Sequence, residues 1–154
     1  MNAQPNMDRF LEAQNSTFDQ VLFELRAGYK RTHWMWFIFP QISGLGTSST
    51  SEYYSLHSIS EARFFLKHSL LGSRLIECTD LVNNAKVNSA RMIFGTPDDL
   101  KFHASMTLFS IVQPNEIVFS KALSKYFGDT HHELTLKQLS LNQAEKRRIT
   151  RNED

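Results

Sequence analysis

The chain has 154 residues, with 17 basic and 16 acidic side chains, 41% hydrophobic residues and one cysteine. A chain of this length most often forms one domain, and it can bury enough surface for a core without disulfides or structural metals. A lone cysteine cannot form an internal disulfide or a cysteine-based zinc cluster, and we find neither a secretion signal nor an apolar run long enough to cross a membrane. We therefore expect a cytoplasmic protein that does not associate with membranes.

Basic charge is concentrated at the C-terminus. Residues 142–154 hold four basic and three acidic side chains, which leaves thirteen of each kind in the rest of the chain. Nucleic-acid binding needs many clustered cations, so we expect none from the neutral body of the protein. We predict one helical domain over residues 8–141, followed by a mobile charged tail over residues 142–154.

Helical periodicity dominates the chain. Apolar residues recur at spacings of three and four, with capping residues before them and glycine or proline after them. No stretch alternates like a hairpin strand, so we predict an all-α fold, a single compact domain of seven or eight short helices around a central aromatic helix. In chain order, the surrounding helices are expected after Asp8, between Thr17 and Gly28, from Ser58 to His68, from Leu70 to Val82, from Ser89 to Gly95, from Pro97 (capped by Thr96) to Val112, from Ile117 to Phe127, and after Thr130.

The central helix is predicted from residues 33–39, His-Trp-Met-Trp-Phe-Ile-Phe, which are apolar on every side. Such a helix must be surrounded by protein. A buried strand competes with this interpretation, but only Ile38 is β-branched. We expect Thr32 to cap the helix and Pro40 to end it. The polar, glycine-containing residues 41–51 are expected to form a loop.

The aromatic run allows two interpretations. In one, Trp34, Trp36 and Phe37 are simply part of the core, with a hydrogen-bonded histidine beside them. In the other, the same aromatic side chains form the walls of a pocket, with His33 and Gln41 at its mouth. The sequence leaves both open.

These residues resemble the bacterial family known as domain of unknown function 1810, some members of which carry a calpastatin-like label. The resemblance covers about Asp8–Leu141, and it implies an all-helical domain in a bacterial cytoplasm with no established activity. Relatives usually have Lys-Leu-Arg-Ser-Ser where this chain has Lys-Phe-His-Ala-Ser, so a mostly neutral histidine replaces a cation at position 103. The motifs are Arg31-Thr32-His33-Trp34-Met35-Trp36-Phe37-Ile38-Phe39-Pro40-Gln41, Gly44-Leu45-Gly46, Ile93-Phe94-Gly95, Pro97-Asp98-Asp99-Leu100-Lys101 and Ser105-Met106-Thr107-Leu108-Phe109.

One face of the helix after Pro97 carries polar side chains. Asp98, Lys101 and Ser105 share this face because they are three and four residues apart. They could form only a capped helix with an exposed ion pair. Alternatively, Asp98 or Asp99 and Lys101 lie at the rim of the aromatic pocket, where partial burial prepares one of them for acid–base chemistry and Lys101 meets an anion.

Other motifs are weak. Gly44 and Gly46 lack the third glycine of a dinucleotide-binding loop, although the loop could present amide groups to an anion. His131-His132-Glu133 are consecutive, unlike paired metal ligands on a helix, and Cys78 lies on an apolar helical face. We therefore expect no metal and no cofactor.

The sequence predicts an uncharacterised small-molecule pocket protein, and under one hypothesis it is an enzyme that acts on an anionic or nucleotide-like ligand. Whether a reaction is catalysed stays open. The alternative is a non-catalytic protein-interaction module with an unknown partner. The candidate catalytic residues are His33, Asp98 and Lys101, and the candidate ligand-binding residues are Trp34, Trp36, Phe37, Gln41, Gly44, Gly46, Asp99 and Ser105.

Overall fold

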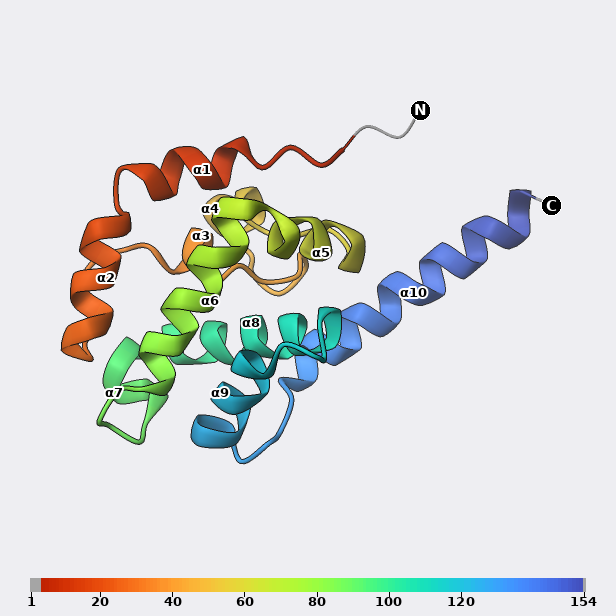
Figure 1. The fold of residues 1–154 in the computed structure, drawn as a ribbon. Helices are drawn as coiled ribbons and strands as arrows, with labels where there is room; N and C mark the ends of the chain where they lie inside the picture. The colour runs from red at the N-terminus through yellow and green to blue at the C-terminus, as the bar shows by residue number, and fades with distance from the viewer. Residues whose placement is uncertain (1–3, 154) are drawn as a thin grey trace.

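The computed structural model describes residues 4–153, and the fold of this part is all-α, as predicted. Its β structure is one isolated parallel bridge, between Ile42 and Leu56. None of the helices within residues 4–153 is both long enough and apolar enough to cross a membrane. Residues 4–153 form ten helices, which are labelled in Figure 1: α1 (Asp8–Asn15), α2 (Phe18–Ala27), α3 (Met35–Ile38), α4 (Ser49–Tyr53), α5 (Ile59–Lys67), α6 (Ser69–Asn83), α7 (Ala90–Phe94), α8 (Asp98–Val112), α9 (Ile117–Phe127) and α10 (Glu133–Glu153).

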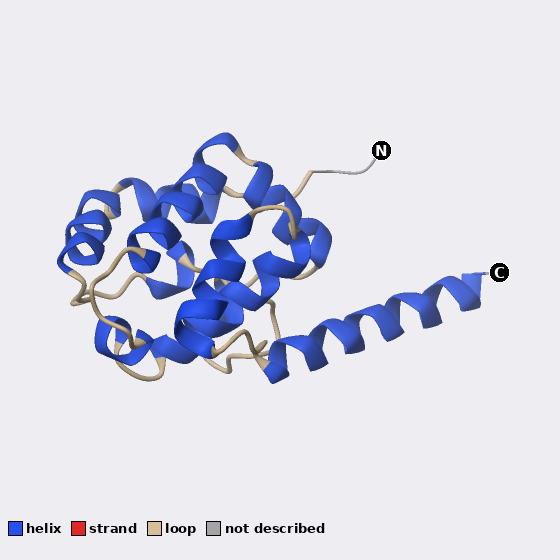
Figure 2. Cartoon of the chain, turned by 60° about the horizontal axis from the view of Figure 1, so that its bottom comes forward, coloured by secondary structure: helices blue, strands red, loops and turns tan. Residues whose placement is uncertain are grey.

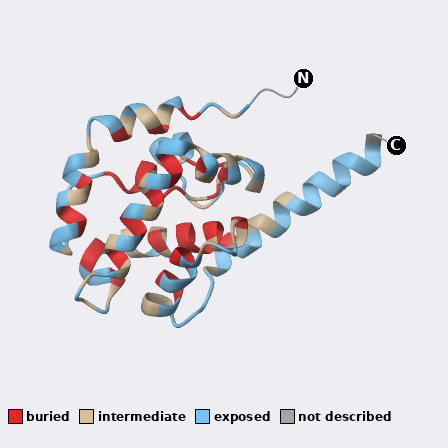
Figure 3. Cartoon of the chain, in the orientation of Figure 1, coloured by how far each residue is buried: buried red, intermediate tan, exposed pale blue. Residues whose placement is uncertain are grey.

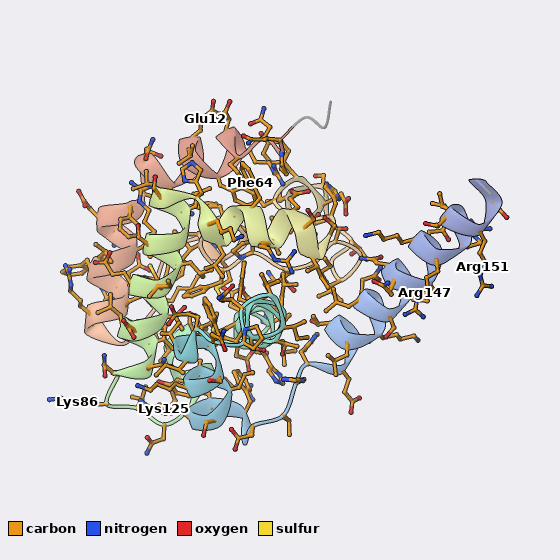
Figure 4. The ribbon with its side chains drawn as sticks, turned by 45° about the vertical axis from the view of Figure 1, so that its right-hand side comes forward. Glu12, Phe64, Lys86, Lys125, Arg147 and Arg151 are labelled. Atoms are coloured by element: carbon orange, nitrogen blue, oxygen red, sulfur yellow. The ribbon has the colours of Figure 1, made fainter. Side chains whose placement is uncertain are left out.

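Helix α8 has other helices around it. It packs against α3, α5, α7, α9 and α10, and it is seen end-on near the middle of Figure 4. Its central residues from Ala104 to Phe109 are all buried, as the red stretch in Figure 3 shows. A helix segment that is buried on every side is expected to be largely apolar. In α8 this stretch is apolar except for Ser105 and Thr107, whose side chains are small.

The aromatic segment forms a shorter helix than predicted. Helix α3 has four residues and packs against α1, α6 and α8. Thr32 does not cap it, because the Thr32 hydroxyl donates a hydrogen bond to Glu24 Oε2 at 2.6 Å. Trp34 takes the N-cap position, and its side chain is 1% exposed. The segment therefore belongs largely to the core.

The predicted loop over residues 41–51 ends in the first residues of α4, Ser49–Tyr53, a helix that the sequence did not indicate. Ser48 caps α4 by accepting a hydrogen bond from the Ser51 amide at 3.1 Å. The ends of the loop are joined by two backbone hydrogen bonds, one from Ser43 to the Leu56 carbonyl and one from Leu56 to the Gln41 carbonyl. These bonds hold the two ends of the segment together.

Local capping signals were read correctly at several helix ends. Ser58 and Ser89 cap α5 and α7 as predicted, and Gly28 and Gly128 end α2 and α9 in the left-handed conformation. The start of α8 differs by one residue. Pro97 takes the N-cap position and the helix begins at Asp98.

Helix α10 begins against the body and then projects from it (Figures 1 and 2). Thr135 is fully buried, whereas residues 143–152 are exposed. The residues expected to form a tail thus continue the helix that begins at Glu133. Their mobility stays a prediction.

Candidate functional site

A hollow of about 290 Å³ lies between the segment after α3, the start of α8 and the start of α10. One part of its wall is apolar and another carries amide, hydroxyl, imidazole and ammonium groups. The only formal charge among its lining residues is that of Lys101, because the others are neutral side chains or a histidine that burial keeps neutral. The lining residues are Trp36, Gln41, Leu45, Gly46, Thr47, Ser48, Ser51, Pro97, Leu100, Lys101, His132 and Leu134.

Two lysines contact the Asp98 carboxylate, and each of them also lies over the ring of a tryptophan. Lys101 Nζ lies 4.8 Å from the Trp36 ring centroid and 3.3 Å from Asp98 Oδ1. Lys30 Nζ lies 5.1 Å from the Trp34 ring centroid and 2.8 Å from Asp98 Oδ2. One carboxylate is thus shared by two ammonium groups, with Lys30 the closer. The group keeps a net positive charge, and Lys101 presents it at the hollow.

Glu24 organises the chain before α3. Its carboxylate accepts hydrogen bonds from the backbone amides of Arg31 and Thr32, the Thr32 hydroxyl, the Gln20 amide and, at 3.0 Å, the Trp34 indole. Burial by itself raises the pKa of Glu24, but these hydrogen bonds outweigh it and lower the pKa to about 2. Glu24 is therefore an ionised, buried carboxylate that fixes the backbone leading to Trp34.

His132 is a residue of the hollow that the sequence did not indicate. Its backbone amide donates to Thr107 Oγ1 at 2.9 Å, which docks the start of α10 on α8. Its Nδ1 accepts a hydrogen bond from the Thr135 amide at 3.3 Å, so the imidazole caps α10. Burial, and then the nearby His103 ring, lower the pKa of His132, so the imidazole is neutral at pH 7. Three consecutive polar residues, His131 to Glu133, offered no spacing signal for this role.

The structure brings together four of the predicted site residues. Trp36, Gln41, Gly46 and Lys101 line the hollow, and Gly44 lines an adjoining crevice. Asp98 is not among the lining residues, but it contacts Lys101 directly.

The other predicted residues lie elsewhere. His33 is exposed and does not line the hollow, so the expectation that it shares one cavity with Lys101 is not met. The reason is local, because the side chains on either side of His33 both bind Glu24. Two aromatic wall candidates belong to the core instead, Trp34 and Phe37, which are 1% and 7% exposed.

Two polar candidates on α8 also lie away from the hollow. Ser105 is fully buried and Asp99 is partly buried, and neither is a lining residue. Ser105 Oγ and Asp99 Oδ1 are buried without a hydrogen-bond partner among the described residues. Within residues 4–153, no three His, Cys, Asp or Glu side chains gather as metal ligands.

The fold and the hollow define an all-α protein with a cationic, partly polar surface cavity. A family model described as a protein of unknown function (DUF1810) matches residues 4–139, and the chain belongs to this family. The resemblance drawn from the motifs is thereby confirmed. The family match ends within α10, so the remainder of that helix lies beyond it.

A solved structure supports the same fold. The crystal structure of a conserved hypothetical protein from Mycobacterium tuberculosis is similar to this chain, with 46% sequence identity and a TM-score of 0.85. The similarity covers 87% of this chain and 96% of that one. No curated protein matches the chain.

Proposed function

We propose that the hollow binds a small anionic molecule. The observation that carries the proposal is the position of Lys101, whose ammonium group supplies the only formal charge among the lining residues. The volume of about 290 Å³ is near the lower end for small-molecule sites. A ligand of metabolite size therefore fits the cavity better than a long chain would.

The charges around Lys101 favour an anion over a neutral ligand. Asp98 Oδ1 lies 3.3 Å from Lys101 Nζ, but the same carboxylate is closer to Lys30. Two cations against one anion leave a positive potential at the mouth of the cavity, and the low-dielectric wall strengthens it. Lys101 also covers one face of Trp36. A planar ligand ring would have to pack elsewhere, and Leu45, Leu100 and Leu134 supply apolar surface for it.

Catalysis at this hollow would depend on few groups. Lys101 and His132 are the titratable side chains among the lining residues. Asp98 contacts Lys101 but does not line the hollow, so it would be a positioning residue. Binding of an anion is therefore the function that the geometry supports best. Which reaction could take place here would depend on the identity of the ligand.

The experiment is a thermal-shift series with inorganic phosphate, adenosine monophosphate, glycerol 3-phosphate and acetate. We expect at least one phosphate compound to raise the melting temperature of the wild type, because a ligand that binds only the folded state stabilises it. Lys101→Met should abolish the shift, since it removes the charge and keeps most of the stem. Lys121→Met, at an exposed position on α9, is the matched control. Absence of any shift, or a shift that survives Lys101→Met, would contradict the proposal.

The alternative function, a protein-interaction module, is supported by the outer half of α10. Residues 143–152 are exposed, and Figure 4 labels Arg147 and Arg151 on this half, away from the body. Under this alternative, deletion of residues 143–154 abolishes partner binding. Under the first proposal the same deletion leaves the phosphate-induced thermal shift unchanged.

A further inference from the structure

We propose that His132 determines ligand specificity in the hollow by donating its Nε2–H to an oxygen of the anion that Lys101 holds. This inference rests on the proposed function. It adds a second ligand-binding group to the site, because the His132 Nε2–H is a neutral hydrogen-bond donor whereas Lys101 is a cation. The ligand class it selects is an oxyanion with at least two free oxygens, as in a phosphate monoester or a carboxylate.

The hydrogen bonds of His132 determine its tautomer. A backbone N–H can only donate, so Nδ1 must accept where it meets the Thr135 amide at 3.3 Å. Thr135 Oγ1 lies 2.8 Å from the same nitrogen. In a neutral imidazole the proton then resides on Nε2, which is a donor.

The Nε2 edge is available to a ligand. Nothing within residues 4–153 forms a hydrogen bond with it, and it is not one of the buried unpartnered polar atoms, so solvent reaches it. His132 is a lining residue of the same hollow as Lys101. In the proposed site the donor and the cation face this one volume, and an oxyanion bound there contacts both.

The neutral state of the imidazole makes this donor selective. Lys101 lines the same cavity, and the His103 ring centroid lies 5.5 Å from that of His132, so a second positive charge on His132 would be unfavourable. A neutral N–H donates a hydrogen bond to a ligand that has a free oxygen acceptor. Because it carries no charge, it does not attract every anion over a long range. An oxyanion can offer separate oxygens to the imidazole N–H and to the Lys101 ammonium group, whereas a halide ion is a single acceptor atom.

Two substitutions separate the capping role from the donor role. His132→Asn keeps an acceptor for the Thr135 amide, because asparagine is a good N-cap, and it removes the distal N–H. His132→Gln reaches further with an amide donor but loses the near acceptor. His131→Asn, at an exposed neighbouring position, is the matched control.

The experiment is a titration of the ¹⁵N-labelled full chain with inorganic phosphate, glycerol 3-phosphate, acetate and chloride, followed through the imidazole nitrogens of His132. We expect the Nε2–H tautomer without ligand and a change of the Nε2 resonance with the oxyanion that binds. His132→Asn should keep the wild-type melting temperature and bind that oxyanion about tenfold more weakly or worse, as expected for loss of a hydrogen bond to a charged group. His132→Gln should be less stable yet retain more of the affinity.

The outcomes discriminate between the two proposals. An Nδ1–H tautomer, or His132→Asn binding the oxyanion as tightly as the wild type while Lys101→Met does not bind, overturns the role of His132 alone. If none of these anions binds the wild type, both the proposed function and this inference are wrong. A phosphate-only or acetate-only response identifies which oxyanion the site accepts.

Discussion

The ion pair between Lys30 and Asp98, at 2.8 Å, joins the segment before α3 to the start of α8. Only 6% of the Lys30 side chain is exposed, so its ammonium group has little water to replace the carboxylate. The same carboxylate contacts Lys101 at 3.3 Å, and this second lysine is 24% exposed. The ammonium groups of Lys30 and Lys101 thus share one carboxylate, that of Asp98.

We expect Asp98→Asn to lower the free energy of unfolding by about 3 kcal/mol, because it leaves the Lys30 charge buried and unpaired. Lys30→Met in the same background should restore much of that loss. Urea unfolding of the two single variants and the double variant measures the coupling. Additive effects, with no recovery in the double variant, would show that the pair contributes no such coupling.

Glu24→Gln tests the buried carboxylate before α3. The folded pKa of about 2 lies below the ordinary value of 4.5, so ionised Glu24 stabilises the fold above pH 4.5, and this stabilisation is lost as the pH falls towards 2. At about 1.4 kcal/mol per pKa unit, the variant should lose roughly 3 kcal/mol at neutral pH. The difference from the wild type should shrink steadily below pH 4.5.

Unfolding in urea between pH 2 and pH 7 measures this dependence. Glu12→Gln, at an exposed position on α1, controls for the loss of one negative charge. A stability difference between Glu24→Gln and the wild type that does not vary with pH would contradict the explanation.

Gly72→Ala tests the close approach of α5 and α6. A Cβ atom at position 72 would lie 1.9 Å from the Leu66 carbonyl oxygen, which belongs to the backbone and cannot rotate away. We expect a loss of about 3 kcal/mol, which corresponds to a fall in melting temperature of roughly 5–10 °C for a chain of this size. Calorimetry gives the melting temperatures of this variant and of the control Ser73→Ala, which changes the exposed next position. Equal melting temperatures would show that the two helices can separate at little cost.

Cys78 should be unreactive in the folded protein. Burial raises the pKa of its thiol to about 12, and the residue is fully buried on α6. Iodoacetamide at pH 8 should leave the native chain unmodified over hours and alkylate the urea-unfolded chain fully. Mass spectrometry counts the adducts, and rapid modification of the native protein would show that α6 opens readily.

Removal of residues 143–154 should leave the stability of the fold nearly unchanged. Residues 143–152 are exposed, and the whole segment lies beyond the family match. We expect the free energy of unfolding to change by no more than about 0.5 kcal/mol, as for other surface changes. A urea titration measures this. A loss well above that value would mean that the outer half of α10 stabilises the body.

The start of α10 and the segment before α3 show which features can be predicted from sequence patterns and which cannot. Gly28 and Ser89 were assigned correctly because a cap depends on residues within one turn of it. His132 was missed because its role depends on Thr107 and on the hollow, which no local spacing encodes. His33 was a candidate because of its aromatic neighbours, yet one of them, Trp34, binds Glu24, which lies ten residues earlier in the chain.

The sequence by itself determined the helical class, most helix ends and the family, because periodicity, caps and motifs are local properties of the chain. It left open whether the aromatic run is core or the wall of a pocket. Tertiary structure alone decided which polar groups meet. Trp36, Lys101 and His132 line one cavity although they lie far apart along the chain, since packing around α8 places the segment after α3 beside the start of α10. Such a meeting depends on how side chains fill space between distant helices, and it leaves no regular pattern in the order of residues.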